Sequence, residues 1–147
     1  MFNETPSGGS AHGATLDILA RARPELLKAL AETLLEGMGE ISVITNRTGL
    51  VMVPMRDTVE NVDFHLGEVL VSEAHIADAA GHVGYGMVTG RDLERAMAMA
   101  VVDLRLAAFG EEPAITSFLS EERDHQAAED TARMRQVEAT RVEMETF

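Results

Sequence analysis

The chain has 147 residues, of which 46% are hydrophobic, so it is long and apolar enough to form one domain with its own core. Cysteine is absent, which excludes disulfides, thiolate nucleophiles and cysteine-held zinc or iron–sulfur sites. The formal net charge of −13 argues against autonomous nucleic-acid binding, because neutralising phosphates needs a basic surface.

No apolar run reaches membrane-spanning length, and the start of the chain lacks a basic segment followed by an apolar stretch. We therefore expect a cytoplasmic protein that inserts in no membrane. Residues 1–13 are rich in Gly, Ser and Pro and are expected to form a disordered leader.

The first predicted helix runs from about Thr15 to Leu35, with leucines at three- and four-residue spacing. Pro24 is expected to kink this helix or to start a second one. Two β-rich runs follow at 41–45 and 50–55, and the residues 46–49 between them predict a hairpin turn.

The polar stretch from Arg56 to Asp63 reads as a loop, and FHLGEVLVSEAHI (64–76) as a third strand. HVGYGMV (82–88) predicts a fourth strand that returns along the third. A helix over about 91–109 and a long polar helical region after Pro113 complete the pattern.

The expected fold class is α+β: a four-stranded antiparallel meander with an N-terminal helix, a helix after the fourth strand and an extended C-terminal helix. We place the α+β domain at 14–112 and the polar helical extension at 113–147. The extension has few large apolar residues, so it is either frayed or packed against another chain.

The glycines of GHVGYGMVTGRD (81–92) allow a nucleotide-binding loop or a strand that ends in a helix cap. A dinucleotide fingerprint needs GxGxxG at the start of a helix in a parallel βαβ unit, and a Walker loop needs Gly-Lys-Ser/Thr. Neither spacing is present. Gly84 and Gly86 instead fall on one strand face, where a helix or another chain can approach closely. Thr89 and Asp92 fit a capping box.

Candidate chemistry is sparse. Arg91 beside free helix amides, together with Arg56, is the candidate anion site. Histidines and glutamates of the third and fourth strands could gather round a metal, but no spacing requires it, and we expect no metal. No catalytic residue can be assigned.

Three blocks carry a resemblance to a known family: TGLVMVPMR (48–56), FHLGEVLV (64–71) and GHVGYGMVTGRDLERAMAMAVVDLRL (81–106). Together, in this order and spacing, they resemble the G subunit (PhnG family) of the bacterial carbon–phosphorus lyase system. Thr-Arg-Val at 140–142 is similar to that family's C-terminal motif. The chain departs from the pattern after Arg56, where DTVEN replaces a Gly-rich loop.

The resemblance implies an accessory subunit of a multi-subunit assembly with subunits of the H, I and J types. Its substrates would be MgATP and a phosphonate, and its product a ribose 1-phosphonate 5-triphosphate. The family implies no catalytic residue and no cofactor on this chain alone. We expect the partner interface at the sheet edge, the glycine face and the polar C-terminal helix, with the residues Gly84, Gly86, Phe64, Met134, Val137 and Arg141.

Two other hypotheses stay open. In the first, the chain is a stand-alone enzyme whose anion site includes Arg56 and Arg91. In the second, it is an acidic binding module that forms a homo-oligomer.

Overall fold

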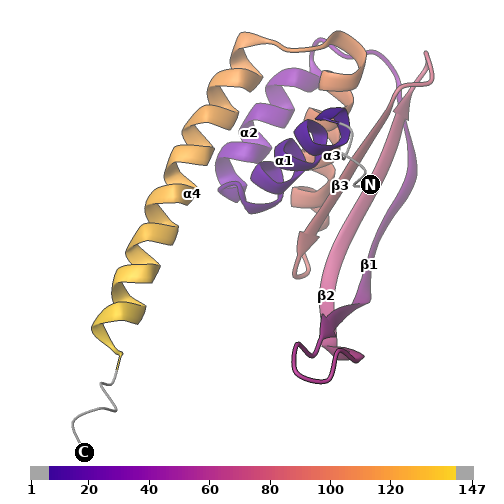
Figure 1. The fold of residues 1–147 in the computed structure, drawn as a ribbon. Helices are drawn as coiled ribbons and strands as arrows, with labels where there is room; N and C mark the ends of the chain where they lie inside the picture. Colours follow the sequence, from indigo (N-terminus) through magenta and orange to yellow (C-terminus); the bar gives the residue numbers. More distant parts are fainter. Residues whose placement is uncertain (1–6, 142–147) are drawn as a thin grey trace, which may run out of the picture.

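The computed structural model describes residues 7–141, with side chains from residue 11 onward. Three helices lie on one side of a three-stranded antiparallel sheet, and the long C-terminal helix contacts the first of them and then runs away from it (Figure 1). The elements are α1 (Ser7–Arg21), α2 (Pro24–Leu35), β1 (Ile41–Arg56), β2 (Asp63–Asp78), β3 (Val83–Thr89), α3 (Leu93–Phe109) and α4 (Pro113–Ala139). The sheet order is β1-β2-β3. The α+β class is therefore confirmed.

The N-terminal helix is split in two, and Pro24 is the first residue of α2. Proline has no amide hydrogen to donate, so a helix tolerates it best in its first turn. The expected start at Thr15 is too late, because α1 begins at Ser7 and includes residues assigned to a leader. The rest of that segment, residues 1–6, lies outside the described part.

The predicted four-stranded meander is wrong, because residues 46–49 do not turn. β1 is one strand of 16 residues that pairs with β2 along its whole length. Asn46 lies opposite Ala74 and Gly49 opposite Val71, and two register shifts absorb the irregularities. A turn at 46–49 would have left much of β2 without a neighbour on this side, and its backbone groups would have lost their ladder.

The turn between β1 and β2 lies where the sequence predicts a loop. The Asp57 carboxylate accepts a hydrogen bond from the amide of Val59 at 2.9 Å. The amide of Asp57 in turn donates to the carbonyl of Val62 at 2.9 Å. Asn61 adopts a positive φ of 56°, which asparagine tolerates better than most residues.

The core lies between the sheet and α1, α2 and α3. Helix α3 is central, and residues on several of its sides are buried: Ala96, Ala98, Met99, Ala100, Val101, Val102, Asp103 and Leu104. Small residues on α3 and on β3 let the helix backbone come close to the sheet. Helix α3 packs against β2 and β3 on one side and against α1 and α2 on the other, so its buried residues are not confined to one face.

Gly84 and Gly86 share one face of β3, as predicted, and both are buried. What approaches them is α3 of the same chain: a Cβ at Gly84 would overlap the carbonyl of Ala100, and one at Gly86 that of Ala96. Their assignment to a partner interface is therefore corrected. The close approach that needs glycine stabilises the core, and it closes this face to another chain.

The capping box at Thr89 is also wrong. Thr89 ends β3, and the N-cap of α3 is Asp92, whose carboxylate accepts from the Arg95 amide at 3.0 Å. Gly90, with φ of 91°, makes the turn between them. The Ser72 hydroxyl donates to the Gly90 carbonyl at 2.7 Å and accepts from the Asp92 amide at 2.9 Å, which joins the turn to β2.

Candidate functional site

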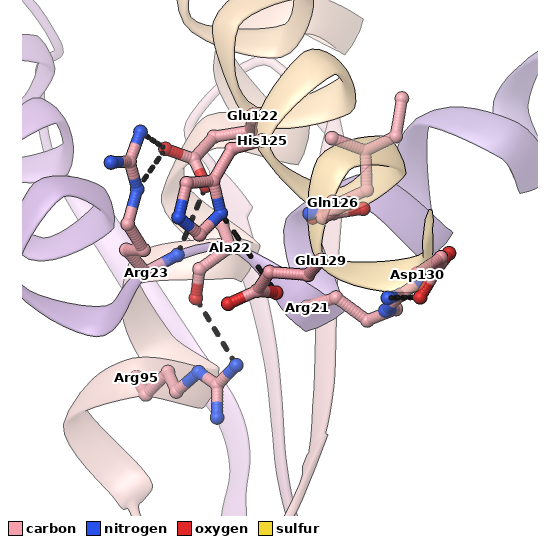
Figure 2. Close-up of polar contacts among 10 residues, drawn as sticks. Arg21, Ala22, Arg23, Arg95, Glu122, His125, Gln126, Glu129 and Asp130 are labelled. Atoms are coloured by element: carbon pink, nitrogen blue, oxygen red, sulfur yellow. Dashed lines mark hydrogen bonds and ion pairs between the residues drawn. The ribbon is translucent and has the colours of Figure 1, made fainter. Parts of the chain in front are cut away.

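Helix α4 meets the junction of α1 and α2 through a buried carboxylate (Figure 2). Glu122 accepts hydrogen bonds from Nε and Nη2 of Arg23 at 2.9 and 2.7 Å, and from the Arg23 amide at 3.2 Å. Burial raises the pKa of Glu122, but the hydrogen bonds from Arg23 outweigh it and hold the pKa below its ordinary value. This pair therefore couples α4 to the free amide at the start of α2.

Two further contacts fix the direction of α4. The side-chain amide of Gln126 donates to the carbonyl of Ile18 at 2.9 Å, and Arg21 forms an ion pair with Asp130 at 2.8 Å. With Glu122, these contacts span more than two turns of α4 on the side that faces the body (Figure 2). The helix beyond them is consequently held at a set angle to the domain.

From Thr131 to Ala139 every residue of α4 is exposed, and this projecting end of α4 (residues 131–139) lies clear of the other helices and strands (Figure 1). It carries Met134 and Val137, which are 65% and 57% exposed. Arg141 follows the helix, is exposed, and lies 3.4 Å from Glu138. The structure thus places these three predicted interface residues together on one surface, and their binding role stays a prediction.

A second projection is formed by β1 and β2, whose outer halves extend past the helices (Figure 1). We call residues 49–68 the β1–β2 arm. Of these twenty residues only Val53 and Asp57 are not exposed. Its exposed large apolar side chains are Leu50, Val51, Met52, Met55, Val59, Val62, Phe64 and Leu66. Exposed apolar area on this scale is typical of a surface that binds a partner.

The arm contains Arg56, one half of the candidate anion site. Arg56 pairs with Asp63 at 2.9 Å at the tip of the hairpin. Arg91 follows Gly90, whose amide bonds the carbonyl of Leu70. Leu70 lies seven residue steps along β2 from Asp63, which is about 23 Å at roughly 3.3 Å per residue. The structure therefore does not bring the two arginines together.

The N-terminus of α3 is capped by a carboxylate of the chain itself, that of Asp92. Asp92 caps the helix, and hydrogen bonds from the Arg95 amide and then Lys28 hold its pKa below the ordinary value in spite of burial. Lys28 lies 3.3 Å from Asp92 and 3.8 Å from Glu94. A second anion at this helix end would meet two negative charges.

Asp103 is a buried acid that no sequence motif singles out. Asp103 is 5% exposed, and its carboxylate accepts from the Tyr85 amide at 2.9 Å and contacts Nε2 of His12 at 2.8 Å. It links α3 to β3 and α1. The available signal was its position, a single carboxylate within the mainly apolar segment AVVDLRL (100–106) of a predicted helix.

The face of the sheet away from the helices has a polar cluster of its own. Glu73 bonds Nε of Arg47 at 3.0 Å and the hydroxyl of Tyr85 at 2.9 Å. Hydrogen bonds from Arg47 and then Tyr85 lower the pKa of Glu73, while burial and then Glu73 raise that of Tyr85. The ring of His75 meets that of Tyr85 edge-on. Across residues 7–141, no three His, Asp or Glu side chains gather in a metal-binding arrangement.

The fold and the surface define an α+β protein with two projecting, uncovered surfaces. No helix in the described part of the chain is long and apolar enough to cross a membrane. Residues 11–147 match the family model described as phosphonate metabolism protein PhnG, and the chain belongs to this family. It is 30% identical over 131 residues to the alpha-D-ribose 1-methylphosphonate 5-triphosphate synthase subunit PhnG of Rhizobium meliloti (strain 1021). That match covers 88% of this chain and 83% of the relative, so the resemblance in the sequence is confirmed.

Proposed function

We propose that this chain is an accessory subunit of the carbon–phosphorus lyase core complex. The complex would form ribose 1-phosphonate 5-triphosphate from MgATP and a phosphonate. Two findings support this role: membership of the PhnG family, and a relative whose name makes it a subunit of ribose 1-methylphosphonate 5-triphosphate synthase. The partners would be the I-, H- and J-type subunits in the cytoplasm.

The observation that carries the accessory role is the exposed apolar surface of the β1–β2 arm. Fully burying one large aliphatic side chain contributes about 1.5–3 kcal/mol. The arm exposes eight large apolar side chains, among them Leu66 at 64% and Val59 at 90%. Because these side chains are already partly buried, at 38–90% exposed, burying three of them in a partner would contribute about 3–5 kcal/mol before the costs of association. The projecting end of α4 adds Met134 and Val137.

Catalysis would belong to other subunits. The two candidate anion-binding arginines lie apart, and the helix end beside one of them is capped by its own aspartate. With a net charge of −13, the chain would not retain a polyphosphate by itself. MgATP would thus be a substrate of the complex, and no cofactor would be held by this chain alone.

Co-expression with an I-type subunit of the synthase tests the proposal. The full chain is expected to co-purify in fixed proportion. A chain ended after Thr131 keeps the contacts of Glu122, Gln126 and Asp130 and loses the projecting end, so it is expected to fold and to bind more weakly. A chain ended after Arg123 also loses two of those contacts and is expected to bind least.

Two controls separate binding from folding. Thermal unfolding of each truncated chain reports whether the domain is intact. In the full chain, Arg133→Ser and Arg135→Ser remove charge from the same exposed end and keep its apolar residues, so they should preserve most of the binding. A full chain that stays separate from every other subunit of the synthase would contradict the proposed function.

A further inference from the structure

Strand β1 is the edge of the sheet, and part of its backbone faces outward. On β2, the carbonyl of Leu70 accepts from Gly90 and the amide of Asp78 donates to His82, so even-numbered residues bond toward the β3 side. The odd-numbered residues of β2 therefore bond β1, where their opposite residues are also odd-numbered. The amides and carbonyls that point to the outer edge are those of Asn46, Thr48, Leu50 and Met52.

This outer edge is unusually regular and apolar for an exposed strand. The two register shifts of β1 lie between Val43 and Thr45 and between Val53 and Pro54, which leaves a continuous segment at 45–53. Natural edge strands are blunted by prolines, lysines, inward charges or short length. The segment 45–53 has no proline and no lysine, and its one charged residue, Arg47, is paired with Glu73.

The segment also differs in charge from the rest of the chain. Of 147 residues 25 are acidic, yet Ile41–Arg56 contains none. A strand laid along this edge would therefore meet no carboxylate from β1 itself. Two copies of the chain would each carry a net charge of −13, and the repulsion between them opposes pairing of β1 with a second copy.

A cavity lies beside the segment on each face of the sheet. On the helix-covered face a cavity of about 380 Å³ is bounded by Asn46 of β1, by Lys28, Glu32 and Leu35 of α2, and by Glu94, Met97 and Val101 of α3.

On the opposite face a cavity of about 230 Å³ is lined by Arg47, Gly49 and Val51 of β1, by Val71 and Glu73 of β2 and by Met87 of β3, so it lies over the sheet inward of the edge. Successive side chains of an added strand point to opposite faces, so one set would face the cavity on the helix-covered side and the other would lie beside Arg47, Gly49 and Val51.

We propose that the segment 45–53 of β1 is completed by an extended, mainly apolar strand of a partner subunit, which adds to the sheet as its fourth strand. This inference rests on the proposed function. Main-chain hydrogen bonds to the outward groups of 46, 48, 50 and 52 supply affinity, and the cavity on the helix-covered face selects the side chains that point to that side. The apolar floor formed by Leu35, Met97 and Val101 selects aliphatic side chains on the helix-covered face.

Hydrogen exchange on the co-expressed complex with the I-type subunit tests this directly. In the chain alone, the outward amides of Thr48, Leu50 and Met52 have no ladder partner and should exchange quickly. In the intact complex, read residue by residue after quenching, their exchange should slow at least about tenfold. The amides of Gly49 and Val51, which bond β2 in both states, should change much less.

A proline variant gives a second, independent measurement. The outward amide of Leu50 bonds nothing in β2, so Leu50→Pro keeps the β1–β2 ladder while it removes a donor from the edge. It should weaken binding to the I-type subunit at least about tenfold. Leu50→Thr is the matched control, because it trims the apolar side chain and keeps the amide, and it should weaken binding less.

The outcomes separate the two proposals. A chain that forms no complex with any synthase subunit contradicts the proposed function itself. A complex that forms while the outward amides of β1 keep exchanging as in the free chain overturns the strand addition alone. Protection that rises with concentration in the chain alone, together with a doubled mass, would identify a second copy as the occupant and also overturn it.

Discussion

Replacing Gly86 by alanine tests the closest contact in the core. The new Cβ would overlap the carbonyl oxygen of Ala96 and lie 2.9 Å from the Ala100 amide nitrogen. Both atoms belong to the backbone of α3, so no side chain can rotate away. Relief requires α3 and β3 to separate by more than 1 Å, since non-bonded heavy atoms prefer roughly 3.5–4.0 Å.

The cost follows from that separation. A radial gap of 0.5–1 Å forfeits about a quarter to a half of each van der Waals contact it opens. Overpacking of a well-packed core typically costs about 1–3 kcal/mol, occasionally more. The contact at Gly86 is with rigid backbone, and α3 packs on both β2 and β3, so we expect about 3 kcal/mol.

Urea unfolding followed by circular dichroism measures this loss. With an m-value of about 2 kcal/mol/M, a loss of 3 kcal/mol lowers the midpoint by about 1.5 M. Gly49→Ala is the matched control, because it is also a strand glycine and a Cβ there meets nothing within 4 Å. Its stability should change by no more than about 0.5 kcal/mol. Equal midpoints for the two variants would refute the close approach of α3.

Three further predictions concern the polar contacts. The lowered pKa of Glu122 stabilises the fold above its unfolded value of about 4.3, and this stability is lost as the pH falls through the folded value. The urea midpoint should therefore fall less on acidification in Glu122→Gln than in the unchanged chain. Asp103→Ala leaves the buried amide of Tyr85 without its acceptor and should cost about 1–3 kcal/mol, while Asp103→Asn should cost less. Tyr85 is the one tyrosine of the chain, so ultraviolet titration reports on it alone and should give a pKa above about 10. The substitution Glu73→Gln should lower the pKa of Tyr85, because it removes the negative charge beside the hydroxyl.

Local patterns in the sequence predicted most of the elements. The break at Pro24, the loop after Arg56 and the strand over 82–88 are all determined by residues close in the chain, and the structure has them. The family resemblance needed only the order and spacing of three sequence blocks, and it is confirmed by the family match.

The errors have a shared physical cause, which is pairing between distant residues. Asn46-Arg47-Thr48-Gly49 has the composition of a turn, but a 16-residue β2 offers each of these residues a partner, and the extended form satisfies more backbone groups. The same holds for Gly84 and Gly86: the pattern predicts a close approach, but only the tertiary fold identifies α3 as the element that approaches.

The cap of α3 illustrates a further limit. The side chains of Thr89 and Asp92 could both cap the start of α3. The Ser72 hydroxyl of β2 binds the Asp92 amide that the Thr89 hydroxyl would otherwise cap, and Asp92 is the residue that caps the helix. The buried Glu122 and its partner Arg23 are likewise separated by 99 positions in sequence. Periodicity alone could not have found either contact.

As a subunit without a complete active site, this chain would turn over no substrate on its own. Adenine release from MgATP in the presence of methylphosphonate measures this claim directly, with the purified chain alone, with the remaining synthase subunits alone, and with both combined. We expect product at full rate only from the combination. Turnover by the chain alone, or full turnover by the remaining subunits without it, would contradict the account.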